Sequence, residues 1–201
     1  ERDTELFYDT EDALYRSFWD KEGSLHWGLF DQSTGDDFLN ACANLNRMMV
    51  QKALIDQNSR VLDLGCGPGL SARHMAAAGH QVEAWDASTA MVDLAAAHPG
   101  VAARKADFDA LDATTAYDGI WANFSLLHLP RAALPEALRR IHRALRPKGM
   151  LHLGMKLGHD AGRDALGRYV TYYSEADLTD LTQAAGFTAL RSRRGNRHDR
   201  P

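Results

Sequence analysis

The sequence is poor in cysteine and has no long apolar run. Its two cysteines, Cys42 and Cys66, are too few for a disulfide framework or a cysteine zinc site, so we expect a cytoplasmic protein. No apolar run approaches the roughly 20 residues that cross a bilayer, which argues against a membrane partner. Residues 1–5 are acidic and lack the layout of a signal peptide. The chain also lacks an initiator Met, so we expect it to be trimmed or incomplete at that end.

The composition is that of an ordinary globular protein, with 45% hydrophobic and 25% charged residues. A length of 201 residues fits one domain with a substantial core. The formal net charge of −4 argues against a nucleic-acid partner. The charge is uneven, because residues 191–201 contain five Arg and one Asp. We interpret residues 196–201 as a solvated, disordered basic tail, and an arm that contacts RNA is the alternative.

Two stretches of the N-terminal part have apolar residues at helical spacing. The first ends before Gly23 and contains Leu6, Ala13, Leu14, Phe18 and Trp19. The second follows a turn region at 28–35 and contains Phe38, Leu39, Cys42, Leu45, Met48, Met49 and Leu54. They predict a helical lid or cap over residues 1–58.

From residue 60 onward, short apolar runs alternate with helical segments. The runs predict strands at 60–64, 81–85, 101–106, 117–124, 150–155 and 187–193, with helices at 70–78, 88–97, 131–145 and 174–185. This alternation predicts an α/β, Rossmann-like fold, with a doubly wound, mostly parallel sheet and helices on both faces. Such sheets bind ligands at the carboxyl ends of their strands.

A glycine-rich loop, Gly65-Cys66-Gly67-Pro68-Gly69, follows the first predicted strand. Glycines permit positive φ and let a ligand approach the backbone closely. Leu70 stands where a dinucleotide fingerprint needs Gly or Ala, which argues against a nicotinamide dehydrogenase. Asp63 would repel a pyrophosphate but suits a ligand that carries an ammonium and a sulfonium. Asp86 ends the second strand, where an acid can accept hydrogen bonds from both ribose hydroxyls.

Together these features resemble the class I S-adenosylmethionine-dependent methyltransferases. Residues 61–69 are similar to motif I of that family, and residues 83–88 to its motif II. Residues 122–128 resemble the segment after the fourth strand, and residues 146–149 the turn into the fifth. The resemblance implies that residues 59–195 form the domain that binds S-adenosylmethionine, with S-adenosylhomocysteine as the product.

The resemblance also implies which residues contact this cofactor. Gly65 and Gly67 would line its methionine part, Asp86 would hold the ribose, and Asp107 with Phe108 would contact the adenine. The full expected set is Asp63, Gly65, Cys66, Gly67, Asp86, Ala87, Met91, Asp107, Phe108, Asn123 and Phe124.

Methyl transfer from a sulfonium requires alignment of the partners and, for some acceptors, removal of a proton. His128, just past the fourth strand, and His26, in a predicted loop, are the candidate catalytic residues, because imidazole is near neutral at working pH. Packing ahead of Pro130 is the alternative role for His128. The nine His are scattered along the chain, and no metal site is expected.

Aromatic residues are the candidates for binding the acceptor. Tyr15, Trp19 and Trp27 lie in a part that resembles the lid of small-molecule methyltransferases, where aromatic rings can surround a cation; Trp19 alternatively packs the first helix. Tyr169 and Tyr172 precede the last helix. The preceding loop, 157–167, contains three glycines and is expected to move as a lid.

The chain departs from the family at its C-terminal end, where about fourteen residues follow Phe187. The seventh strand of the family's sheet is therefore expected to be missing or truncated, and the chain to be a monomer or a homodimer. The expected function is methyl transfer to a small-molecule N, O or C acceptor. The alternatives are an RNA (tRNA) methyltransferase and a non-catalytic nucleotide-binding or interaction module.

Overall fold

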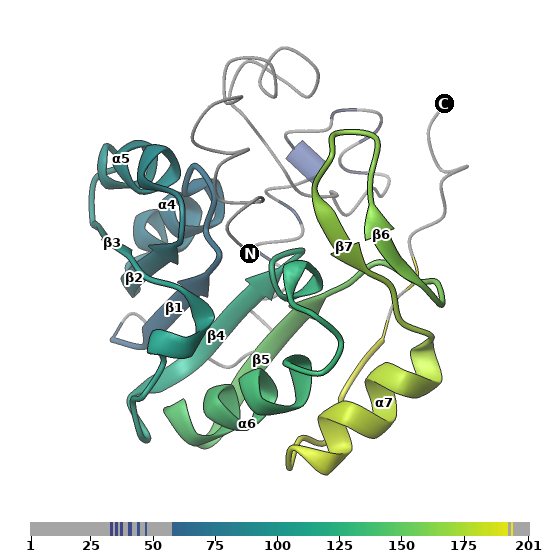
Figure 1. Ribbon diagram of the computed structural model, residues 1–201. Coiled ribbons are helices and arrows are strands. Elements are labelled where there is room, and N and C mark those ends of the chain that lie inside the picture. The colour runs from purple at the N-terminus through teal and green to yellow at the C-terminus, as the bar shows by residue number, and fades with distance from the viewer. Residues whose placement is uncertain are drawn as a thin grey trace.

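The computed structural model describes residues 58–192, Arg194, and seven earlier positions: Ser33, Gly35, Asp37, Asn40, Ala41, Asn44 and Arg47. The predicted cap over residues 1–58 therefore lies almost wholly outside the described residues. A five-stranded parallel sheet with the order β3-β2-β1-β4-β5 forms the centre (Figure 1). Its strands are β1 (Arg60–Leu64), β2 (Gln81–Asp86), β3 (Val101–Lys105), β4 (Tyr117–Asn123) and β5 (Leu145–Gly154).

Three helices make the crossovers between these strands: α4 (Leu70–Ala77), α5 (Thr89–Ala96) and α6 (Leu134–Ala144). Two short 3-10 helices, η1 (Phe108–Ala110) and η2 (Leu126–His128), follow β3 and β4. The strand order runs outward from β1 in one direction and from β4 in the other, so the sheet is doubly wound as predicted. The switch point, where ligands of such sheets bind, lies between the carboxyl ends of β1 and β4.

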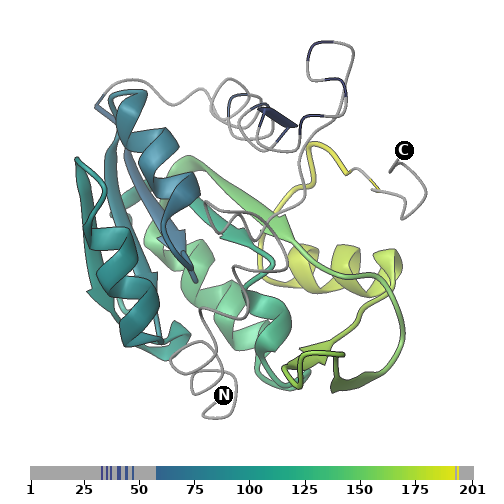
Figure 2. The same cartoon turned by 90° about the horizontal axis from the view of Figure 1, so that it is seen from above.

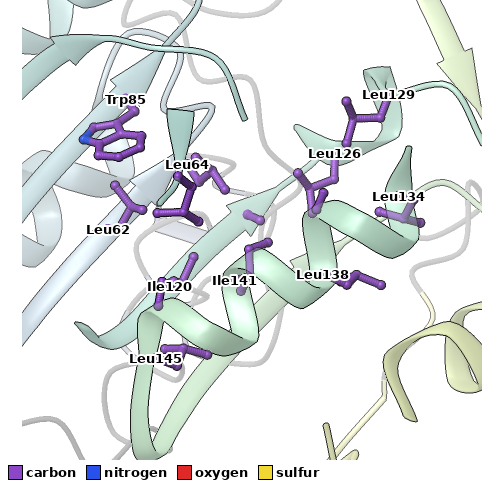
Figure 3. Packing of buried hydrophobic residues seen from close by; sticks show 14 of the residues in the cluster. Leu62, Leu64, Trp85, Ile120, Leu126, Leu129, Leu134, Leu138, Ile141 and Leu145 are labelled. Atoms are coloured by element: carbon purple, nitrogen blue, oxygen red, sulfur yellow. The ribbon is translucent and has the colours of Figure 1, made fainter. Parts of the chain in front are cut away.

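One hydrophobic core lies between the sheet and α6. Leu62, Leu64 and Ile120 point from β1 and β4 toward Leu138 and Ile141 of α6 (Figure 3). All five side chains are buried. Successive residues of a strand point to opposite faces, so this cluster uses alternate residues of β1.

The second core lies on the other face of the sheet, against α4 and α5. Val61 and Trp121 contribute from the strands, Ala72 and Met75 from α4, and Ala95 from α5. Helices therefore cover both faces, and the predicted fold class is confirmed.

The start of α6 differs from the position predicted from the sequence. Helix was expected from Arg131, but residues 131–133 form a turn, closed by a hydrogen bond from Ala133 N to Pro130 O, and α6 begins at Leu134. Pro135 explains the difference. It has no amide hydrogen and fits only in the first turn of a helix, where it lies when α6 begins at Leu134.

The predicted loop at 157–167 is in fact half of a hairpin. Strand β6 (Ala161–Arg163) pairs antiparallel with β7 (Tyr169–Thr171). Asp164 shapes the connecting turn, because its Oδ1 accepts hydrogen bonds from the backbone amides of Leu166 and Arg168. The hairpin and α7 (Glu175–Ala184) lie at the opposite end of the molecule from α4 and α5 (Figures 1 and 2).

The predicted strand at 187–193 is wrong for the part that the structure describes. Residues 187–192 have no strand, and no strand follows α7 up to Ser192. Phe187 instead donates its amide to Thr182 O at the end of α7 and packs edge-on against His142, with ring centroids 5.1 Å apart. The apolar residue that suggested a strand therefore ends a helix and covers the first core.

Candidate active site

The glycine loop leaves β1 at the switch point and is fixed to β2. The amides of Gly65 and Cys66 both donate to the Trp85 carbonyl oxygen, at 2.8 and 2.9 Å. Gly65, Gly67 and Gly69 have φ values of +76°, +52° and +80°, in the left-handed region that favours glycine. The loop thus turns sharply over the carboxyl end of β1.

Glycine at position 65 also lets three strand ends come together. A Cβ on Gly65 would overlap Ser125, which follows β4, and would lie 3.6 Å from the Phe108 ring, which follows β3. A Cβ on Gly69 would lie 2.7 Å from Ala95 Cβ in α5. Because glycine has no Cβ, the ends of β1, β3 and β4 can lie close together around Gly65.

Asp86 lies beside this loop at the end of β2. Its Oδ2 accepts a hydrogen bond from Gly67 N at 2.8 Å, and its Oδ1 accepts one from Ser88 N at 3.0 Å. The carboxylate is half-buried. Each carboxylate oxygen can accept more than one hydrogen bond, so these contacts are compatible with ribose hydroxyls on the same group. The ribose contact itself stays a prediction.

Asp63 is a buried carboxyl group on the face of the sheet that packs against α4. It is 1% exposed. Burial raises the pKa of Asp63 to about 8, and the negative charge of Asp86 contributes to this rise. A hydrogen bond from the Ala72 amide lowers the pKa by a smaller amount. In the described part of the chain, its Oδ2 accepts no hydrogen bond. A buried, unpartnered carboxyl oxygen next to the glycine loop fits a cationic ligand group.

Two expected cofactor contacts have buried side chains. Cys66 is fully buried in the second core, and burial raises the pKa of its thiol. Met91 is 2% exposed, and its amide donates to the Ser88 hydroxyl at 3.2 Å. Ala87, between β2 and Ser88, is half-buried. Their contacts with a cofactor stay predictions.

The segment after β3 holds Asp107 and Phe108. Asp107 is exposed and caps η1, because its Oδ1 accepts a hydrogen bond from Ala110 N at 3.0 Å. The Phe108 ring is half-buried and packs on the first core. The structure thus places Phe108 against the glycine loop and Asp107 further out toward solvent. Their adenine contacts stay predictions.

The segment after β4 makes a sharp turn at Phe124, whose φ is +55°. The Phe124 amide donates to Gly154 O at 3.0 Å, which ties the turn to the end of β5. Asn123 is buried, and its Oδ1 lies 3.0 Å from His152 Nε2. His152 was not identified in the sequence, although its position on β5, in register with Trp121, could have pointed to it.

His128 ends η2 and faces the hairpin. Its Nδ1 lies 2.7 Å from the Tyr169 carbonyl oxygen, which can only accept, so Nδ1 carries the hydrogen and Nε2 the lone pair. Burial, followed by the charges of Arg168 and Lys156, lowers the pKa of His128 to about 4. This imidazole is therefore neutral over the physiological pH range. Nearby, Thr171 Oγ1 donates to Leu129 O at 2.7 Å, so the hairpin holds η2 at two points.

The two tyrosines expected in the acceptor pocket lie on and just after β7. Tyr169 and Tyr172 are both half-buried. The carbonyl oxygen of Tyr169 contacts His128, and the Tyr172 side chain lies against Gly158, where a Cβ would come within 2.8 Å. The Tyr172 carbonyl also accepts a hydrogen bond from Arg131. The structure thus brings Tyr169 to His128, whereas Tyr172 packs on the segment before β6.

Four expected site residues, Tyr15, Trp19, His26 and Trp27, lie outside the described residues. In the part of the chain that is described, no group of three or more His, Cys, Asp or Glu side chains is arranged to hold a metal ion. The helices described there include none with the length and apolar character needed to cross a membrane.

Fold and site together define a doubly wound α/β domain with a glycine loop and acidic side chains at its switch point. Residues 61–149 match the family model described as Methyltransferase domain. Over 138 residues the chain is 33% identical to malonyl-[acyl-carrier protein] O-methyltransferase of Erwinia pyrifoliae, an alignment that covers 65% of this chain and 52% of that protein. In this central part the chain is therefore similar to methyltransferases.

Solved structures share the fold. The cyclopropane synthase MmaA2 from Mycobacterium tuberculosis superimposes with a TM-score of 0.79 at 17% identity, covering 94% of this chain and 75% of that one. A Burkholderia thailandensis 1,6-didemethyltoxoflavin-N1-methyltransferase, solved with bound 1,6-didemethyltoxoflavin and S-adenosylhomocysteine, gives a TM-score of 0.64 at 22% identity, covering 96% of this chain and 80% of that one. The chain spans about half the length of the Erwinia relative.

Proposed function

We propose that this protein transfers a methyl group from S-adenosylmethionine to a small-molecule N, O or C acceptor. The observation that carries the proposal is the buried carboxyl group of Asp63, two residues before Gly65, of which one oxygen has no hydrogen-bond partner among the described residues. The relatives support the acceptor class, because one is named for O-methylation of a malonyl group and another for N-methylation of a toxoflavin precursor.

The cofactor would supply an activated methyl group on a positively charged sulfur. Gly65 and Gly67 would let its methionine part approach the backbone, Asp86 would accept hydrogen bonds from its ribose, and Phe108 would lie beside its adenine. This methyl group would pass to an electron pair of the acceptor, and the cofactor would be left as a neutral thioether. The protein's main task is alignment.

His128 is the described residue suited to remove a proton from the acceptor. It is neutral, and the hydrogen bond to Tyr169 O fixes the tautomer whose Nε2 bears the lone pair. An acceptor that attacks through a hydroxyl group, or through an amine that is bound in its protonated form, must lose one proton, which Nε2 would accept. A carboxylate acceptor needs no base, so the dependence on His128 reports which kind of atom is methylated.

The RNA alternative has lost part of its support. It rests on the arginine-rich residues 191–201, and one of these arginines, Arg194, makes a two-point ion pair with Glu175 of α7, at 2.5 and 2.8 Å. The cytoplasmic location and the choice between monomer and homodimer stay predictions.

The proposal is tested by incubating the protein with a metabolite pool and methyl-labelled S-adenosylmethionine. We expect label in a small organic product and none in added tRNA. The His128→Gln and His26→Ala variants are run in parallel. Label that enters RNA alone, or no label in any fraction although the cofactor binds, would contradict the proposal.

A further inference from the structure

A row of side chains crosses one face of the sheet at the level of Asp63. Residues in register on neighbouring parallel strands project on the same face, and Asp63 of β1 is in register with Trp121 of β4, which is in register with His152 of β5. The rings of Trp121 and His152 are stacked, with centroids 4.2 Å apart. Asn123 stands on the same face, one step nearer the carboxyl edge.

The hydrogen bond between Asn123 and His152 determines the direction of the amide group. Oδ1 of Asn123 lies 3.0 Å from His152 Nε2, and an amide oxygen can only accept, so Nε2 carries the hydrogen. The amide nitrogen, Nδ2, therefore faces away from His152. Gly154 leaves the space for this arrangement, because a Cβ there would overlap Oδ1 of Asn123.

The Asn123 amide nitrogen is a donor that the described protein leaves unused. Asn123 is 3% exposed, and among the residues described here Nδ2 has no hydrogen-bond partner. An unpaired buried donor is costly, and native proteins keep few of them. This donor lies at the carboxyl end of β4, where the ligands of a doubly wound sheet bind.

We propose that Asn123 Nδ2 donates a hydrogen bond to an oxygen atom of the bound ligand, and that His152 is the positioning residue that keeps the amide in this direction. The inference rests on the proposed function for the identity of the ligands. A carboxylate or carbonyl oxygen suits such a donor. It belongs either to the amino-acid part of the cofactor or to the acceptor.

Three variants distinguish a role of His152 in positioning the Asn123 amide from a role in packing alone. His152→Phe keeps an aromatic ring on Trp121 but loses the donor to Oδ1, so the amide is free to turn. His152→Gln restores an N–H donor without the ring. Asn123→Asp replaces the donor with a carboxylate that repels an anionic oxygen. His80→Gln is the matched control, because His80 is also buried but directly precedes β2, at the opposite edge of the sheet.

Calorimetry with S-adenosylhomocysteine and with 5′-methylthioadenosine, which lacks the amino-acid part, tests whether the oxygen belongs to the cofactor. If the oxygen is the cofactor carboxylate, His152→Phe and Asn123→Asp bind S-adenosylhomocysteine about tenfold or more weakly. Binding of 5′-methylthioadenosine stays as in the wild type, His152→Gln recovers part of the loss, and His80→Gln changes neither affinity.

If the oxygen belongs to the acceptor, both affinities stay unchanged. In that case the KM of the acceptor found in the labelling screen rises about tenfold in His152→Phe, and His152→Gln restores it. Folded His152→Phe and Asn123→Asp variants with wild-type affinities and an unchanged KM would overturn the inference. A wild-type protein that binds neither adenosyl compound would instead contradict the proposed function.

Discussion

Ser125 is bonded to Leu64 across the switch point of the sheet: its hydroxyl donates to the Leu64 carbonyl oxygen at 2.6 Å. Leu64 ends β1 and Ser125 follows β4, so this buried contact joins the two strands between which the cofactor is expected to bind. Gly65 makes the approach possible, because any side chain there would occupy the space of Ser125.

Gly65→Ala is therefore expected to lower both stability and affinity for S-adenosylhomocysteine. The left-handed backbone at φ +76° costs alanine roughly 1–2 kcal/mol, and the overlap with Ser125 adds to this by moving the end of β4. Thermal unfolding and calorimetry measure the two effects. Gly162→Ala is the control, since a Cβ at Gly162 meets nothing within 4 Å. Equal behaviour of the two variants would contradict this role of Gly65.

Asp63→Asn is expected to stabilise the free protein and weaken cofactor binding. The pKa of Asp63 is raised to about 8, so the folded state holds this proton more tightly than the unfolded state. Stability is then lost as pH rises from about 4 to about 8, by an amount on the order of a few kcal/mol. Urea unfolding across this range measures it.

The amide in the Asp63→Asn variant has no such proton to lose, so the stability gap between variant and wild type should widen with pH. The affinity for S-adenosylhomocysteine should fall in the variant, because the cationic ammonium group loses its carboxylate. A gap that is constant from pH 4 to pH 8 would show that Asp63 is ionised throughout.

His128→Gln tests the proposed base. If the acceptor must lose a proton, kcat is expected to fall by roughly 100- to 10,000-fold, while the affinity for S-adenosylhomocysteine stays unchanged. Steady-state kinetics on the acceptor measures kcat. A small effect on kcat with an acceptor that carries a proton on the attacking atom would assign His128 to packing.

The same residue gives a pH dependence of stability. The pKa of His128 falls from 6.5 to about 4 on folding, so the unfolded state binds the proton more tightly between these values. The wild type is expected to lose stability as pH falls from 6.5 toward 4, and His128→Gln to lose less. Unfolding of both proteins at pH 7 and pH 4.5 measures the difference.

The hairpin depends on a buried ion pair, because the Asp164 and Arg168 side chains are 12% and 10% exposed and lie 2.6 Å apart. Asp164→Ala leaves a buried charge and two turn amides without their partner, and is expected to cost roughly 3–5 kcal/mol. The double variant Asp164→Ala/Arg168→Met should recover part of this cost. Denaturant unfolding measures both. If the double variant recovers no stability, the loss comes from the two turn amides alone.

The sequence predicted the sheet well because parallel, doubly covered strands are short apolar runs with polar residues at their ends. Asp63, Asp86 and the glycine loop could be placed from this pattern alone. The capping box at the start of α7, with Ser174 accepting from the Asp177 amide at 3.0 Å, follows from the local sequence in the same way.

Other features depend on contacts between distant residues. β6 and β7 have three residues each, too few for alternation to be recognised. The hydrogen bonds of His128 to Tyr169 and of Asn123 to His152 join positions 41 and 29 residues apart. In the sequence alone, Phe187 is an apolar residue of the kind found in strands. Only its contacts in the folded chain, with His142 and the first core, show where it lies.

Asp86 and the glycine loop are proposed to hold a cationic adenosyl cofactor. Calorimetry of S-adenosylmethionine and of NAD with the wild type and with Asp86→Ala tests it most directly. We expect micromolar binding of S-adenosylmethionine that Asp86→Ala abolishes, with NAD bound far more weakly. Binding of NAD that is tighter than that of S-adenosylmethionine, or an affinity unaffected by Asp86→Ala, would contradict the account.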